Sequence, residues 1–281
     1  MHDKGSAFCK KIVYCLNMGR MIPKKRIYLT FVLLALTLTA CKTEDADIVV
    51  TDGAIEVTSV DAQAEGEEAD ITEGDEIAED EFYISEITDD IFLRIEGKSF
   101  KSDCSLPRED LRYLHLLHKN LEGETLEGEM MVNVHIADDV LEIFRELYEI
   151  GYPIEKIRLI DEYDADDELS MEDNNSSSFN FRTVSGTGKI SKHGLGMAID
   201  INPFYNPYIR NTSSGVVIEP YGSEMYADRS SDFDYKIDTD DEAYRIFTEH
   251  GFFWGGAWKN QKDYQHFEIP TEEIRKYYSW Y

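Results

Sequence analysis

Two short stretches of this sequence carry side chains that could hold one metal ion. The first, residues 191–203, places His193 and Asp200 seven positions apart, with two glycines between them and an apolar run at its end. That pattern suits a turn entering a strand that presents both side chains to one ion. The second stretch, residues 263–268, has an aspartate three positions before His266. We interpret each stretch as half of a metal site, although His193 and Asp200 could also form a hydrogen-bonded structural pair.

The residue types in these stretches suit zinc catalysis. A catalytic zinc takes three protein ligands and leaves a fourth position for water, whose pKa falls to about 7. His193, Asp200 and His266 would be the ligands. Asp263 is the candidate general base, because a carboxylate beside a metal ligand stays ionised and can accept a proton. Arg182 is a candidate electrophile for the oxyanion of a tetrahedral intermediate, but it could instead pair with the acidic loop before it.

Neighbouring residues have simpler interpretations. Glu268 lies two positions after His266, so on a strand it would share that histidine's face and could orient the ligand. Trp254 and Trp258 are expected to be core or groove walls.

Composition excludes several functional classes. The chain has 281 residues and a formal net charge of -29, a field that repels phosphate backbones, so we expect no nucleic-acid partner. Three of the four cysteines precede the segment with globular composition, which excludes a disulfide framework there. No Cys-x-x-Cys pair is present, which excludes a thiolate zinc knuckle.

The N-terminal region, residues 1–40, predicts a secretory signal. A basic stretch at 24–26 precedes the apolar run 27–40, which is shorter than the roughly 20 residues that a spanning helix needs. The run ends at Cys41 in a Leu-Thr-Ala-Cys sequence that resembles the bacterial lipobox, so we expect Cys41 to be lipidated. The alternative is an ordinary signal peptide followed by a chance cysteine.

The sequence then divides into a tether and a domain. Residues 41–81 hold sixteen acidic residues and one basic residue, a composition that cannot offset the entropy of ordering and that predicts a disordered tether. Residues 82–281 predict the folded domain. The residues before 21 lack secretory character, so Met18 or Met21 is the more natural start.

Periodicity within the domain predicts its main elements. Apolar spacing predicts helices over 108–120, 140–150 and 240–250, and alternation predicts a strand over 130–136. Residues 210–238 have weak patterning and predict a long surface excursion.

Two separated motifs then point to a known family. They are Ser191-x-His193-x-x-Gly196-x-Ala198-x-Asp200 and Asp263-x-x-His266-Phe267-Glu268. Together they resemble the signature of the zinc D,D-peptidase and L,D-endopeptidase family of bacteria and phages. Its members include the VanX and VanY type dipeptidases and carboxypeptidases and the phage L-alanyl-D-glutamate endolysins. The resemblance runs from about Val132 to Glu268, and the segment 174–182 resembles the part of the family that carries its transition-state arginine.

The resemblance implies a fold and a set of roles. The fold would be a compact α+β domain of the hedgehog/D,D-peptidase type, with an antiparallel sheet carrying the ligands and helices packed on it. One Zn²⁺ per domain would be bound by His193, Asp200 and His266, with Asp263 as the base and Arg182 polarising the carbonyl. An aspartate at position 263 is more like the endopeptidase branch of the family.

These observations predict a lipid-anchored zinc peptidase of the bacterial cell envelope. We expect it to be a monomer on the outer or plasma membrane, facing the wall or the exterior and touching the membrane only through its lipid. Its partner would be a peptidoglycan stem peptide, cut by an endopeptidase of the L-alanyl-D-glutamate type. The alternatives are a D-alanyl-D-alanine carboxypeptidase and, in another class, a non-catalytic, zinc-stabilised peptidoglycan-binding module.

Overall fold

The computed structural model describes residues 81–184 and 186–281. The predicted signal region, Cys41 and nearly all of the acidic tether lie outside the described residues, so those features stay predictions. Within the described ranges, no helix combines the length and the apolar character needed to cross a bilayer.

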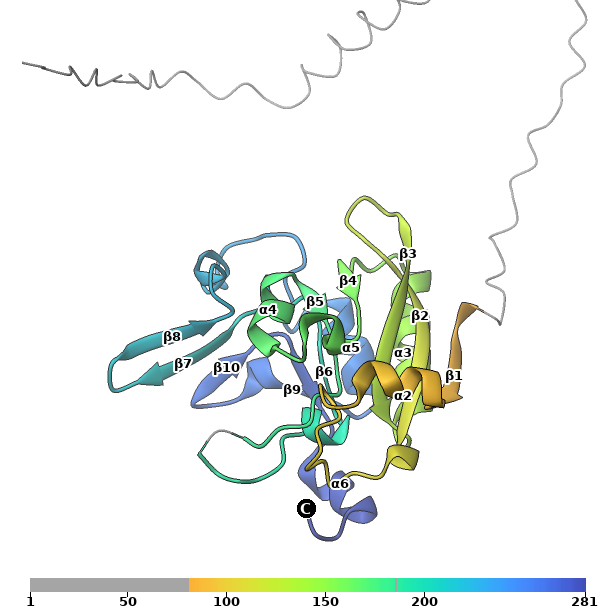
Figure 1. Ribbon diagram of the computed structural model, residues 1–281. Coiled ribbons are helices and arrows are strands. Elements are labelled where there is room, and N and C mark those ends of the chain that lie inside the picture. Colours follow the sequence, from red (N-terminus) through yellow and green to blue (C-terminus); the bar gives the residue numbers. More distant parts are fainter. Residues whose placement is uncertain (1–80, 185) are drawn as a thin grey trace, which may run out of the picture. The chain divides into compact units, whose positions relative to one another are not determined.

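Five α-helices and eleven strands make up the described part of the chain (Figure 1). The helices are α2 (Asp89–Ile95), α3 (Ala137–Glu149), α4 (Asp167–Glu172), α5 (Glu242–Glu249) and α6 (Thr271–Tyr277). The strands are β1 (Tyr83–Glu86), β2 (Leu111–Lys119), β3 (Thr125–Asn133), β4 (Lys156–Ile157), β5 (Asn175–Ser176), β6 (Ala198–Asp200), β7 (Tyr208–Thr212), β8 (Gly215–Glu219), β9 (Phe253–Trp254), β10 (Gln261–Asp263) and β11 (His266–Glu268).

An antiparallel sheet ordered β1-β2-β3 packs against α3 (Figure 1). The helix predicted over 108–120 is wrong, because this segment forms the central strand β2, paired along its whole length with β3. Its leucines do not alternate, since both faces of the strand are covered: Leu116 and Leu117 point to opposite faces and both are buried. The strand predicted over 130–136 is the end of β3 followed by a turn.

The helices predicted over 140–150 and 240–250 are confirmed as α3 and α5. Each buries one apolar stripe, and the stripes meet where the rings of Phe144 and Phe247 pack edge to face at 6.4 Å. Asp241 caps α5 by accepting a hydrogen bond from the backbone N–H of Ala243.

A second antiparallel sheet, ordered β6-β11-β9, carries two of the predicted metal ligands. Asp200 on β6 lies directly opposite His266 on β11, and the buried Phe267 follows on the same strand. The Phe267 ring stacks on Phe247 of α5 with 4.3 Å between ring centres. The α+β class, with helices packed against antiparallel sheets, is therefore confirmed; the short pair β4-β5 is parallel.

A third sheet, ordered β10-β7-β8, extends from the strand that ends in Asp263. Its strands β7 and β8 form the first part of the predicted excursion over 210–238, which also includes the short 3₁₀ helix η6 (Glu224–Tyr226). Arg229 holds this segment in place by donating to the carbonyl oxygens of Tyr205 and Ile237 and to the side-chain oxygen of Asn206.

Candidate metal centre and active site

His193, Asp200 and His266 converge at one point in the structure. His193 Nε2 lies 3.2 Å from Asp200 Oδ2, and His266 Nδ1 lies 2.9 Å from Asp200 Oδ1. The two imidazole nitrogens are 3.1 Å apart. Ligand atoms about 2.0–2.2 Å from a tetrahedral zinc would lie about 3.3 Å from one another. Both the spacing of these donors and their chemistry therefore fit zinc.

The turn that carries His193 is built by its glycines. His193 opens the 3₁₀ helix η5 (His193–Leu195), which ends at Gly196 in the left-handed conformation, with φ of 65°. A Cβ at Gly196 would lie 2.8 Å from the backbone nitrogen of Asn133, and the Asn133 side chain donates to the carbonyl of Leu195. The close approach to the end of β3 thus requires glycine and fixes where the turn enters β6.

Outer partners select the ligand nitrogen on each histidine. His193 Nδ1 lies 2.7 Å from the carbonyl oxygen of Ser178, so it donates there and leaves Nε2 for a metal. His266 has the opposite arrangement: its Nε2 lies 3.1 Å from Glu268 Oε2, which leaves Nδ1 facing Asp200. The Ser178 carbonyl follows β5 in the chain, and no side-chain pattern in the sequence marks it.

The ionised form of Asp200, at the centre of the group, is strongly stabilised by its neighbours. Burial alone would raise the pKa of Asp200, but its contacts with His193 and His266 outweigh burial and hold that pKa well below its usual range. Burial would likewise lower the pKa of His266, but its hydrogen bonds to Asp200 and Glu268 raise it to about 10. Without a metal the two groups thus form an ion pair, and a metal ion bound here would displace the proton from His266.

Asp263 stands at the end of β10, beside the metal group. Its Oδ1 atom is buried and has no hydrogen-bond partner among the described residues. Burial raises the pKa of Asp263 to about 7, against the opposing influence of His266. Gly255 packs against both residues, since a Cβ there would lie 2.9 Å from the Asp263 Cβ and 3.2 Å from the His266 Cβ. An unpartnered carboxylate oxygen in this position can accept a proton.

The backbone of Arg182 packs against the first motif. Its carbonyl accepts the N–H of Ser191, and its backbone closely approaches Gly194. Its side chain forms an ion pair with Asp167, at 2.8 Å between Nε and Oδ2. This is the alternative that the sequence left open, but the pairing is incomplete: Arg182 Nη1 is buried and has no partner in the described part of the chain.

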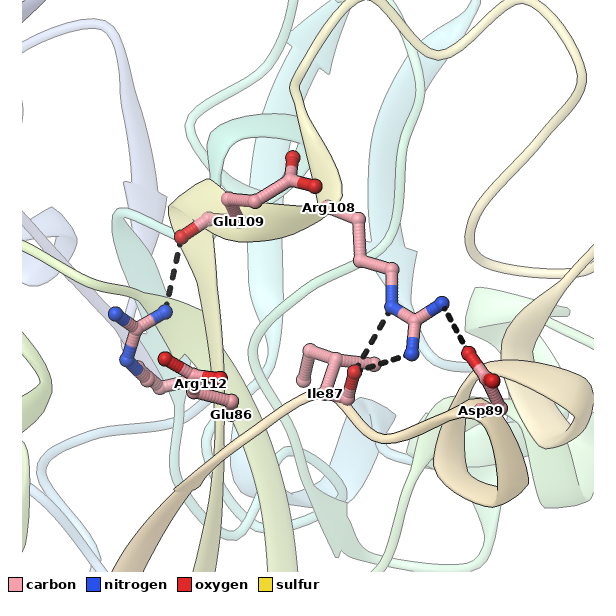
Figure 2. Close-up of a pocket in the computed structure, with 6 residues that line it drawn as sticks. All are labelled: Glu86, Ile87, Asp89, Arg108, Glu109 and Arg112. Atoms are coloured by element: carbon pink, nitrogen blue, oxygen red, sulfur yellow. Dashed lines mark hydrogen bonds and ion pairs between the residues drawn. The ribbon is translucent and has the colours of Figure 1, made fainter.

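Two other features lie outside this group. Asp139, Glu142 and His250 form a second cluster of possible ligand atoms on the surface, in which His250 is 3.3 Å from Asp139. A cavity of about 340 Å³ lies near the start of the domain, lined by Glu86, Ile87, Asp89, Arg108, Glu109 and Arg112. Figure 2 shows that Arg108 is already committed to the Ile87 carbonyl and to Asp89. None of the predicted site residues lines this cavity.

Comparison with known proteins agrees with the geometry. Residues 185–269 match a family model described as D-alanyl-D-alanine carboxypeptidase, a segment that spans both motifs. Searches of curated proteins and of solved structures gave no match. The family is zinc-dependent, and the residues brought together here have the donors that zinc takes. Through this segment the chain is similar to the zinc D,D-peptidase family, and the match supports a zinc-dependent peptidase.

Proposed function

We propose that the chain is a cell-envelope enzyme that hydrolyses peptide bonds in peptidoglycan stem peptides, on a domain of the hedgehog/D,D-peptidase type. One observation carries the proposal: the buried group of His193, Asp200 and His266 stands beside the unpartnered carboxylate oxygen of Asp263. Three ligands with a free base beside them are what metal-assisted hydrolysis requires.

We assign the following roles to the residues of this proposed site. His193, Asp200 and His266 would hold the zinc ion, which when bound lowers the pKa of a coordinated water and polarises a carbonyl. Asp263 Oδ1 takes a proton from the attacking water and delivers it to the leaving amine nitrogen. The free Nη1 of Arg182 donates to the oxygen on which negative charge develops. The carbonyl of Ser178 keeps the ring of His193 in the required orientation.

We favour endopeptidase cleavage of the L-alanyl-D-glutamate type, supported by the aspartate at position 263. The D-alanyl-D-alanine carboxypeptidase alternative is favoured by the description of the matching family model. Digestion of purified muropeptides, followed by mass spectrometry, separates the two. We expect cleavage of the bond between L-alanine and D-glutamate, which releases the rest of the stem peptide. Loss of a single terminal alanine would establish the carboxypeptidase instead.

A non-catalytic binding module would need the metal group but not the base. We therefore expect Asp263→Asn to lower the rate of muropeptide cleavage by about 10²- to 10⁴-fold, the usual contribution of a general base. The variant should keep one zinc per chain by elemental analysis. If neither the wild type nor Asp263→Asn cut muropeptides while both bound zinc and sedimented with peptidoglycan, the module would be the better description.

The N-terminal features give the proposed location. Lipidation of Cys41 after removal of the signal would tether the domain to a membrane of the envelope, facing the wall or the exterior. Metabolic labelling with a fatty acid tests this point: the wild type should carry the label, and Cys41→Ser should lose it and be released from membranes. Label retained in Cys41→Ser would contradict the assignment.

A further inference from the structure

Lys192 connects the two halves of the metal site. It precedes His193 in the first motif, and its backbone carbonyl accepts the N–H groups of Leu195 and Met197 in the glycine turn. Its side chain reaches the second motif, where Nζ lies 2.9 Å from Glu268 Oε1. The Lys192 side chain is only 12% exposed, and that of Glu268 16%. A lysine is rarely this buried unless it is paired, and here its partner is the Glu268 carboxylate.

Glu268 is held at both of its oxygens. Oε1 accepts from Lys192, and Oε2 faces Nε2 of His266 at 3.1 Å. A carboxylate with one partner on each oxygen has a fixed plane, whereas one with a single partner can rotate about its last bond. The contact with Oε2 is what directs Nδ1 of His266 toward Asp200, and Lys192 therefore acts on the ligand through Glu268.

We propose that Lys192 is a positioning residue for His266: it holds Glu268 so that Nδ1 of the histidine stays aimed at the metal. The inference rests on the proposed role of His266 as a zinc ligand. Among the described residues, Lys192 is the lone lysine or arginine in an ion pair with any of the three carboxylates Asp200, Asp263 and Glu268.

The direction in which zinc affinity changes when Lys192 is replaced separates this positioning role from a purely electrostatic one. Removing a positive charge near a dication should tighten zinc binding if charge alone matters. Removing a positioning residue should weaken it, because the loss of an outer partner of a metal ligand costs about 10- to 100-fold in affinity. A third role, binding a carboxylate of the substrate, would change KM and leave zinc affinity unchanged.

The test measures zinc affinity of the full-length protein by competition with a chromophoric chelator, with no peptide present. Lys192→Met should weaken binding at least about tenfold, and Lys192→Arg should restore it to near the wild-type value. Lys262→Met is the matched control, since the one hydrogen bond of Lys262 Nζ within the described residues goes to the backbone carbonyl of Gly256. Glu268→Gln should reproduce the loss, and adding Lys192→Met to it should weaken binding no further.

Several outcomes would overturn the proposal. Unchanged or tighter zinc binding by Lys192→Met would show that the lysine does not position the ligand, as would an equal further loss in the Glu268→Gln background. A raised KM with unchanged zinc affinity would assign Lys192 to the substrate. If Lys192→Met does not fold by circular dichroism, Lys192→Gln and Glu268→Gln give the same comparison. Failure of the wild type to bind zinc would instead remove the proposed metal site itself.

Discussion

At the scale of single residues, the pKa values of two neighbouring aspartates are shifted in opposite directions. Asp200 contacts both histidines, which keep its pKa well below the usual range. Asp263 has a buried oxygen without a partner, and burial raises its pKa to about 7. Environments that push the pKa values of like groups apart mark the division between a permanent anion and a proton carrier. The sequence proposed Asp200 as a ligand and Asp263 as a base that stays ionised, whereas burial raises the pKa of Asp263.

Arg182 is the site residue whose role most needs a direct test. We expect Arg182→Met to lower kcat/KM by about 10²- to 10³-fold, the usual loss when a donor to a developing oxyanion is removed. Zinc content should be unchanged, because Arg182 is not among the metal-binding group. Steady-state kinetics on a stem peptide, with elemental analysis of each variant, provides the measurement.

Asp167→Asn is the control for this prediction, because it breaks the ion pair and leaves the arginine in place. Both partners are about one-third exposed, so the loss in stability should stay within about 1 kcal/mol. Activity should fall far less than in Arg182→Met. Equal losses in the two variants would mean that the arginine serves only to hold α4.

At the scale of elements, the start of α5 contains a partly buried acid. Asp241 accepts hydrogen bonds from Ala243 N–H and from the hydroxyl of Tyr152, and burial raises its pKa to about 6. A folded-state pKa above the unfolded value means that the folded protein binds more protons between about pH 4 and 6. Asp241 therefore destabilises the fold increasingly as pH rises through this window, and its effect is constant above it.

Asp241→Asn should remove this dependence while keeping a good helix cap. The variant should gain about 1 to 3 kcal/mol over the wild type at pH 7.5 and lose that advantage below about pH 4, as measured by urea unfolding across pH. Asp166→Asn is the matched control, since Asp166 caps α4 in the same way but is exposed. A pH-independent difference between Asp241→Asn and the wild type would contradict the assignment.

The helices and strands also differ in how well the sequence predicts them. The helices α3 and α5 each bury one apolar face, so the helical spacing of their apolar residues predicted them correctly. Strand β2 is covered on both faces, which removed the alternation that marks a strand and left a leucine spacing resembling a helix. The grouping of His193, Asp200 and His266 could be predicted because these residue types and their spacing are specific. The Ser178 carbonyl could not be, because any residue type supplies a carbonyl.

At the scale of the whole molecule, the metal group joins distant parts of the chain. Asp200 and His266 are 66 residues apart, and the intervening chain forms β7, β8, α5, β9 and β10. Packing of Phe267 on Phe247 and the network around Arg229 fold this insertion back onto the site. In the unfolded chain the three proposed ligands are far apart, so a metal ion at this site would bind the folded state much more strongly.

Zinc should therefore stabilise the whole domain in proportion to its binding. At a free zinc concentration of 100 times the dissociation constant, the gain in unfolding free energy is about 2.7 kcal/mol. We expect the thermal midpoint of chelator-treated protein to rise on addition of Zn²⁺ and to respond little to Mg²⁺, which prefers an all-oxygen shell to imidazole nitrogen. His193→Ala, which removes one ligand from the first motif, should lose most of the zinc response. An equal response in that variant would mean that zinc stabilises the fold from another site, of which the surface cluster at His250 is the one to test next.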